Sequence, residues 1–137
     1  MAVLTKFDPW KSLLCTCPPK YSLSPYTGCS HACRYCYITA YIPRAFRCRP
    51  KTDFQARLRR EIIGVNPSLP ICIASSSDPY VPMETKLRLT RNALIFLLEK
   101  GLKVLLITKS SLVTRDIDII RKGNCSVSMS ITTTDNK

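Results

Sequence analysis

The hydrophobic positions of this chain fall into short apolar runs that alternate with helical periods. Residues 69–75 and 103–108 are runs rich in isoleucine, leucine and valine, typical of strands that are buried on both faces. In residues 126–132, serines alternate with Val127, Met129 and Ile131, which predicts a strand with one apolar face. Residues 21–23 predict a short first strand before these three.

A helix is predicted over residues 53–63. Phe54, Leu58 and Ile62 recur at positions i, i+4 and i+8, which places them on one face of that helix. Either Asp53 or Thr52 is expected to cap its first turn through a side-chain oxygen.

Two further helices are predicted between the later strands. The first is long and runs over residues 83–100, ending before Gly101. Its inner stripe is expected to contain Met83, Leu87, Leu94 and Leu98. The second helix is predicted over residues 114–122.

This order of strands and helices predicts an α/β fold with a parallel sheet covered by helices. Polar residues follow the strands at 75–78, 108–110 and 130–135, where parallel strands would bring them to one ligand-binding edge. Four strands make half of a TIM-type (β/α) barrel, which needs about 250 residues when complete. We therefore expect a partial barrel, which is either truncated after the fourth strand or completed by another polypeptide segment. Residues 1–24 are expected to be an irregular lead-in to a domain over residues 25–137.

The amino-acid composition limits the kinds of metal-binding or catalytic site that this chain can form. The 137 residues carry a net charge of +12, eight cysteines and a single histidine, His31. We see neither a signal peptide nor an apolar run long enough for a membrane span, so a cytoplasmic location is expected. In a reducing compartment, cysteines indicate metal binding or thiol chemistry rather than disulfides. With one histidine, sites that need two are excluded.

The densest chemical pattern lies in residues 26–37, where Cys29, Cys33 and Cys36 have C-x3-C-x2-C spacing. Three thiolates on one loop can hold three irons of a cubane cluster and leave the fourth iron open to a substrate or cofactor. A structural zinc site is the alternative, with His31 or one of Cys15, Cys17 and Cys48 as the fourth ligand.

This three-cysteine motif, with an aromatic residue before its last cysteine, resembles the radical S-adenosylmethionine (radical SAM) superfamily. Later segments resemble its spore photoproduct lyase-like branch. They are Ser24–Tyr37, Ser77–Glu84, Leu89–Arg91, Thr108–Ser110, Arg115–Asp118 and Ser130–Thr133.

The resemblance implies a [4Fe-4S] cluster on Cys29, Cys33 and Cys36, with SAM bound at the open iron. It further implies an external electron donor and reductive cleavage of SAM to a 5′-deoxyadenosyl radical that abstracts hydrogen from a substrate. Cofactor contacts are implied for Ser77, Asp78, Lys109 and Ser130, and a hydrogen-atom relay for Tyr35 and Tyr37. On the residues alone, Lys109 and Ser130 are equally ordinary strand-end polar groups, and the two tyrosines are equally apolar shielding for a cluster.

One position departs from spore photoproduct lyase. That enzyme places a hydrogen-donor cysteine two residues before the Ser-Asp pair, whereas this chain has Ser75 there. Cys72 lies three residues earlier and is expected to be a small core residue. The departure argues against repair of thymine dimers by that enzyme's route.

The segment from Arg44 to Arg60 is strongly basic, with seven Lys and Arg residues against Asp53. Such a segment can follow phosphates, so nucleic acid is a candidate partner. A solvated surface explains it equally well. The rival to a radical SAM enzyme is therefore a zinc-stabilised basic module that binds nucleic acid without catalysis.

Overall fold

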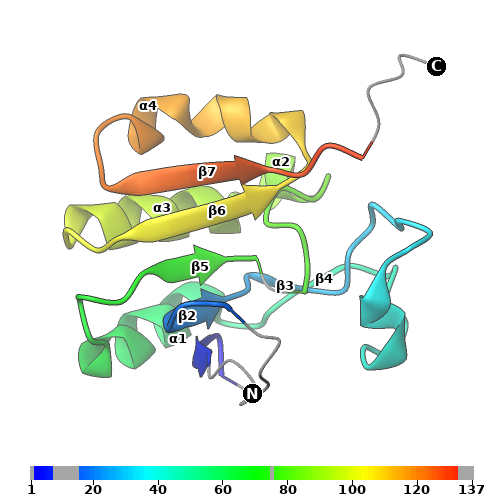
Figure 1. Ribbon diagram of the computed structural model, residues 1–137, viewed down its shortest axis with the longest axis horizontal. Helices are drawn as coiled ribbons and strands as arrows, with labels where there is room; N and C mark the ends of the chain where they lie inside the picture. Colours follow the sequence, from blue (N-terminus) through cyan, green and yellow to red (C-terminus); the bar gives the residue numbers. More distant parts are fainter. Residues whose placement is uncertain (1, 8–15, 75, 133–137) are drawn as a thin grey trace.

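The computed structural model describes residues 2–7, 16–74 and 76–132. Its centre is a five-stranded sheet in the order β1-β2-β5-β6-β7 (Figure 1). The strands are β1 (Leu4–Phe7), β2 (Lys20–Leu23), β5 (Ile71–Ile73), β6 (Val104–Thr108) and β7 (Cys125–Met129). β1 is antiparallel to β2, and the other neighbours are parallel. The fold is thus mixed α/β with a mostly parallel central sheet, compatible with a partial radical SAM fold.

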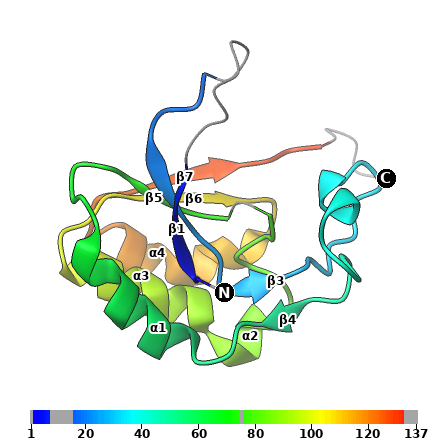
Figure 2. The same ribbon diagram turned by 90° about the horizontal axis from the view of Figure 1, so that it is seen from below.

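The helices α1 (Phe54–Glu61), α3 (Leu89–Glu99) and α4 (Ile117–Ile120) lie on one face of the sheet (Figure 2). Their apolar sides bury Phe54, Leu58, Leu94 and Leu97 against Leu106 and the other core residues of the sheet. β5 is buried at all three positions, as its apolar run predicted. Phe54, Leu58 and Ile62 are also buried, so the predicted helical face is confirmed.

The short elements connect these layers. A 3-10 turn, η2 (Ile62–Gly64), follows α1, and η3 (Ser111–Asp116) precedes α4. A two-stranded antiparallel sheet joins β3 (Tyr26–Thr27) to β4 (Arg49–Pro50), and η1 (Tyr37–Ala40) lies between these strands along the chain. None of the described helices is long and apolar enough to cross a membrane.

The predicted helix over residues 83–100 is wrong as a single element. It is divided into α2 (Glu84–Leu87) and α3 by Arg88, whose φ of 51° lies in the left-handed region. The reason is the buried Glu84, whose carboxylate accepts hydrogen bonds from the backbone N–H groups of Thr90 (3.0 Å) and Arg91 (3.2 Å). Glu84 therefore caps the first turn of α3 from the preceding turn of chain.

Because of this break, the buried residues of the helix differ from those expected. α3 buries Thr90, Ala93, Leu94 and Leu97, whereas Leu87 is 43% exposed. The helix predicted over residues 114–122 is likewise shorter, because residues 111–116 form the 3-10 turn η3 instead.

Two other expectations need correction. Asp53 does not cap α1 with its side chain, because its own backbone is left-handed (φ 51°). The lead-in over residues 1–24 contains two strands of the main sheet: β2 confirms the strand predicted over residues 21–23, whereas β1 was not predicted. Its boundary with the following domain stays a prediction.

β7 lies at the edge of the sheet and is largely exposed, including Val127 (39%) and Met129 (46%). The alternation of apolar and serine residues correctly predicts a strand here, but the strand ends at Met129 instead of residue 132, and among the described residues its apolar side chains stay partly uncovered.

Candidate functional site

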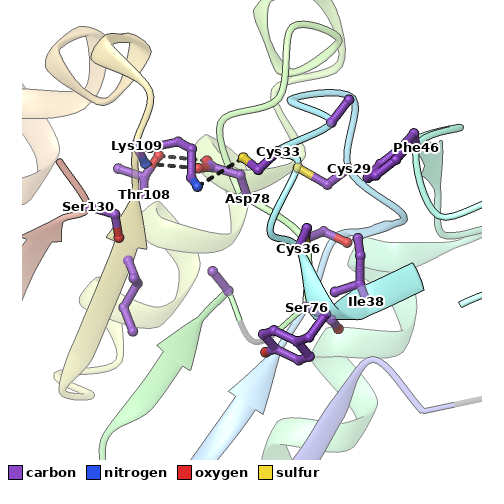
Figure 3. A pocket seen from close by; sticks show the side chains of 15 residues that line it. Cys29, Cys33, Cys36, Ile38, Phe46, Ser76, Asp78, Thr108, Lys109 and Ser130 are labelled. Atoms are coloured by element: carbon purple, nitrogen blue, oxygen red, sulfur yellow. Dashed lines mark hydrogen bonds between the residues drawn. The ribbon is translucent and has the colours of Figure 1, made fainter. Parts of the chain in front are cut away.

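A cavity of about 330 Å³ lies at the edge of the sheet to which the parallel strands point. The segment from Gly28 to Phe46, here called the cysteine loop, forms one wall. The opposite walls come from the chain after β5, the end of β6 and the chain after β7 (Figure 3). Ligands of parallel α/β sheets bind at this carboxyl edge.

The structure brings together residues that are up to 101 positions apart in the chain. Most of the predicted site residues line the cavity; they are Cys29, Cys33, Cys36, Tyr37, Ser77, Asp78, Lys109 and Ser130. Tyr35 is 66% exposed, and its hydroxyl lies 3.0 Å from the Lys109 ammonium. The placement of these residues at one cavity is thus observed, while their roles stay predictions.

The cysteine loop is shaped by a few backbone bonds. Gly28 has a φ of 74°, and a Cβ there would lie 2.7 Å from the Ala45 carbonyl oxygen, so glycine is required. The next amide, that of Cys29, donates to the same carbonyl at 2.8 Å. Further along, the Cys36 N–H donates to the Cys33 carbonyl at 3.0 Å. The loop shaped in this way contributes all three cysteines to the lining of the cavity.

The three thiols differ in exposure and do not yet form a metal-binding group among the described residues. Cys29 is buried and Cys33 and Cys36 are half-buried, and among the described residues no three His, Cys, Asp or Glu side chains are grouped closely enough to hold a metal ion. The Lys109 Nζ instead donates to Cys33 Sγ at 3.1 Å (Figure 3). Hydrogen bonds to Tyr35 and then to Cys33 raise the pKa of Lys109 above its usual value, so it is a cation at neutral pH.

The donor set nevertheless fits an iron–sulfur cluster. Thiolates are the protein ligands of such clusters, and three of them on one short loop facing one cavity leave space for a fourth, non-protein ligand. The Nε2 of His31, the other candidate ligand on this loop, lies 3.8 Å from Asp78 Oδ2. That nitrogen is buried and has no hydrogen-bond partner among the described residues.

The wall opposite the cysteine loop is held much more firmly. Asp78 is 8% exposed, and its Oδ1 accepts from the Tyr80 amide (2.9 Å) and from the Thr108 hydroxyl (2.6 Å). Its Oδ2 accepts from the Lys109 amide at 2.9 Å. Asp78 therefore ties the chain after β5 to the end of β6 and fixes the backbone from which Lys109 projects.

Ser77 is also buried, and its hydroxyl donates to the Tyr26 carbonyl at 3.3 Å. Ser130, in contrast, is exposed at the cavity mouth, and its amide continues the β6–β7 pairing by donating to the Thr108 carbonyl. The predicted cofactor contacts thus divide into buried residues that already have protein partners and more open residues, Lys109 and Ser130.

A buried ionic network that was not predicted from the sequence lies beneath the site. Glu84 is fully buried and accepts from the hydroxyl of Tyr26, the residue that enters the cysteine loop, and from the Arg115 guanidinium at 2.9 Å. Tyr26 is 1% exposed, and burial followed by the hydrogen bond to Glu84 raises its pKa. The network therefore links the start of the cysteine loop to the break between α2 and α3.

The same network extends to Asp116, which is also fully buried. It accepts from Arg91 Nη1 (2.7 Å), Arg115 Nε (2.8 Å) and the Tyr80 hydroxyl (3.0 Å). Burial alone would raise the pKa of Asp116, but the hydrogen bonds from Arg115, Arg91 and Tyr80 hold it below its ordinary value. Glu84, Arg91, Arg115 and Asp116 all lie in segments that resemble the lyase-like branch, but no local pattern predicted that these four side chains would meet.

The other cysteines have different surroundings. Cys72 is buried in β5, as expected for a core residue, and Cys17 is exposed. Cys48 lies near Cys29, and burial followed by the charge of Cys29 raises the pKa of its thiol to about 11. Cys15 and Ser75 lie outside the described residues.

The residues of the basic segment belong to different elements. Arg57 and Arg59 belong to α1, where Arg57 lies 3.9 Å from Glu61 and Arg59 stacks over Phe96. α1 packs beside α3, away from η1 (Figure 2). Arg44 and Arg47 instead flank Phe46, which lines the cavity.

Comparison with known proteins identifies the family of this chain. A sequence model described as the Radical SAM superfamily matches residues 23–137. The chain therefore belongs to the radical SAM superfamily. Membership implies an iron–sulfur cluster and SAM as cofactors and suggests an enzyme.

Two relatives are similar over most of this chain. The uncharacterized protein MJ0683 of Methanocaldococcus jannaschii is 32% identical over 114 residues, which is 75% of this chain and 40% of the relative. The uncharacterized protein Rv2578c of Mycobacterium tuberculosis is 28% identical over 125 residues, or 83% of this chain and 36% of the relative. The chain thus spans well under half the length of these relatives. No solved structure matches.

Proposed function

We propose that the cavity is the cofactor site of a radical SAM enzyme, in which Cys29, Cys33 and Cys36 hold a [4Fe-4S] cluster and SAM binds beside it. The observation that supports this most strongly is the convergence of three thiols and two open polar side chains, Lys109 and Ser130, on one cavity. When bound, the cluster and SAM supply one-electron chemistry that generates a radical able to abstract hydrogen.

In this proposal, the protein's residues bind and orient. The Lys109 ammonium lies 3.1 Å from Cys33 Sγ and can pair with a carboxylate bound between the cysteine loop and β6. The Ser130 hydroxyl can donate to or accept from a ribose at the cavity mouth. Asp78 acts as a positioning residue, because it holds the amide of Lys109 and the hydroxyl of Thr108.

We further propose that the chain belongs to the spore photoproduct lyase-like branch, on the strength of the motifs over residues 24–133. Tyr35 and Tyr37, 66% and 65% exposed, are the candidates for a hydrogen-atom relay. Because Ser75 replaces the donor cysteine of that lyase, we propose hydrogen abstraction from a substrate other than a thymine dimer. An external electron donor would deliver the reducing electron.

The proposal is tested by cleavage of SAM. Anaerobically reconstituted protein, reduced with dithionite, should form 5′-deoxyadenosine and methionine, which liquid chromatography detects. Cys33→Ser should abolish both products, while Cys17→Ser, at an exposed cysteine outside the cavity, should leave them unchanged. Equal cleavage by wild type and Cys33→Ser would overturn the proposal.

Nucleic acid is the partner that a second observation favours. Tyr35, Tyr37, Tyr41 and Phe46 are each at least 44% exposed on the cysteine loop, beside Arg44 and Arg47. Tyr37 and Tyr41 form a ring pair with centroids 5.9 Å apart. Exposed aromatic rings can stack on unpaired bases while arginines contact phosphates.

This second proposal predicts a particular salt and residue dependence. A fluorescent single-stranded oligonucleotide should bind with an affinity that falls steeply with salt. Arg47→Gln should weaken binding and lower the salt slope, whereas Arg59→Gln, on α1, should change neither. Equal effects of the two variants would contradict binding at the cysteine loop and favour a diffuse basic surface.

A further inference from the structure

A second cavity, of about 350 Å³, lies beside the first and contains no predicted site residue. It is lined by hydroxyl-bearing residues of β1, β2 and β3, by Tyr41 and Pro43 of the cysteine loop, and by Lys51, which directly follows β4. Lys51 carries the only charge among the described lining residues. We call this space the Lys51 cavity.

The backbone around Lys51 is fixed. Its N–H donates to the carbonyl of Pro25 at 3.0 Å, just before β3. The side chain is half-buried rather than extended into solvent. The backbone of Lys51 is thus held in place, and its side chain forms part of the cavity wall.

Within the described part of the chain, no carboxylate forms an ion pair with Lys51. The acidic residue that acts on it electrostatically is Glu61. The Oε2 of Glu61, however, accepts from the amides of Val3 (2.9 Å) and Leu4 (2.8 Å), and its Oε1 lies 3.9 Å from Arg57. Both carboxylate oxygens of Glu61 thus already have partners, at the start of β1 and within α1.

The pKa of Lys51 is consistent with an ammonium that has no paired carboxylate. Burial, followed by the positive charge of Arg57, lowers the pKa of the Lys51 ammonium below its usual value, against a smaller opposing effect of Glu61. A half-buried cation without a paired anion is a favourable partner for an anionic group that enters the cavity.

The Lys51 cavity adjoins the cavity that contains the thiols. Ser76, which follows β5, lines both of them. The Tyr37–Tyr41 pair also joins them, because Tyr37 lines the first and Tyr41 the second. A molecule bound at the junction could place one end near Cys36 and the other near Lys51.

We propose that the Lys51 cavity is an oxyanion-binding subsite, which holds a phosphate or carboxylate group of the substrate through Lys51 and neighbouring hydroxyls. The assignment of this group to the substrate rests on the proposed radical SAM function; the binding of the anion does not. The subsite would select an anionic substrate and orient it toward the cavity lined by the cysteines.

The test measures the reactivity of Lys51 itself in the unmodified chain. Lysines are methylated in trace amounts with formaldehyde and cyanoborohydride in inorganic phosphate, in acetate or in chloride at equal ionic strength, and peptide mass spectrometry measures each site. Phosphate at about ten times its dissociation constant should lower methylation of Lys51 about tenfold. Lys86, exposed on α2, should react equally in all three salts.

Protection by phosphate alone assigns a phosphoryl group, and protection by acetate as well assigns a general oxyanion site. Equal methylation of Lys51 in phosphate and chloride would overturn the subsite. So would equal protection of Lys51 and Lys86, because it would indicate screening of a basic surface.

A variant pair gives an independent readout. Phosphate should raise the midpoint of thermal unfolding of Lys86→Met as it does for wild type, and should raise that of Lys51→Met less. Equal shifts would contradict the proposal. Both experiments use protein without cluster or SAM, so failure here leaves the SAM-cleavage result unaffected, and the reverse also holds.

Discussion

The cysteine loop and the chain after β5 face each other across one cavity, but they are held in different ways. The loop depends on Gly28 and a few backbone bonds, and among described residues its thiols do not form a metal-binding group. On the opposite wall, Asp78 accepts hydrogen bonds from Tyr80, Thr108 and Lys109.

The two walls differ in how far their side chains must be ordered before the ligand binds. The thiols need only be close in sequence, because a bound cluster can bring flexible ligands into its own geometry. The polar groups of the opposite wall must be in place beforehand, because a ligand is oriented by residues that are themselves fixed. We therefore expect changes on the two walls to have separate consequences.

The largest effect is expected on the loop. Cys33→Ser should lower the iron retained after anaerobic reconstitution by at least about tenfold, because the loss of one thiolate leaves two ligands for the cluster. Since Cys33 is half-buried and packs little, thermal stability of the metal-free chain should be unchanged. Iron analysis and calorimetry measure the two quantities, with Cys17→Ser as the matched control. Equal iron in both variants would remove Cys33 from the site.

The next effect concerns the network beneath both walls. Glu84→Ala removes a buried carboxylate that Tyr26, Thr90 and Arg115 contact, and should lower the free energy of unfolding by about 3–5 kcal/mol. Urea unfolding of the metal-free chain measures it. Glu99→Ala, at an exposed position on α3, should change it by less than about 0.5 kcal/mol. Similar values for the two would show that the network contributes nothing specific.

A smaller effect is expected at the firmly held wall. Asp78→Asn should cost about 1–3 kcal/mol, because the amide NH₂ would meet donors where the carboxylate oxygens accept. Unlike Cys33→Ser, it should retain iron but bind SAM more weakly, as equilibrium dialysis would measure. Asp53→Asn, exposed and left-handed, serves as control. Loss of iron in Asp78→Asn would show that the two walls are not independent.

The smallest effect depends on pH. The pKa of Asp116 is lowered in the folded state, so its stabilisation is present above the unfolded carboxyl pKa of about 4 and is lost as the pH falls through the folded value. Tyr80→Phe removes one of its hydrogen bonds and should cost about 1 kcal/mol at pH 7. That difference should shrink in acid. A constant difference from pH 7 to acid would contradict this coupling.

The sequence predicted the parts of this molecule that depend on local pattern. The apolar runs located β5 and β6, and the three-cysteine spacing located the loop. Residues such as Lys109 and Ser130 could be placed at the cavity because they end parallel strands, which must meet at one edge.

Contacts between distant residues could not be predicted in this way. Glu84 lies within the residues 83–100 that were predicted as one helix, yet its carboxylate caps α3 and the helix breaks at Arg88. The Lys51 cavity depends on β1, β3 and the cysteine loop together, and no local pattern reports that association. The antiparallel β1 was missed because its four residues show no clear alternation.

The most direct test of the central claim is low-temperature electron paramagnetic resonance of the anaerobically reconstituted, reduced protein, recorded with and without SAM. A [4Fe-4S] signal that changes when SAM is added, and that is absent in Cys33→Ser, is the predicted result, because it reports an iron open to the cofactor. A protein that holds zinc and gives no cluster signal, or a cluster signal that SAM does not alter, would contradict it.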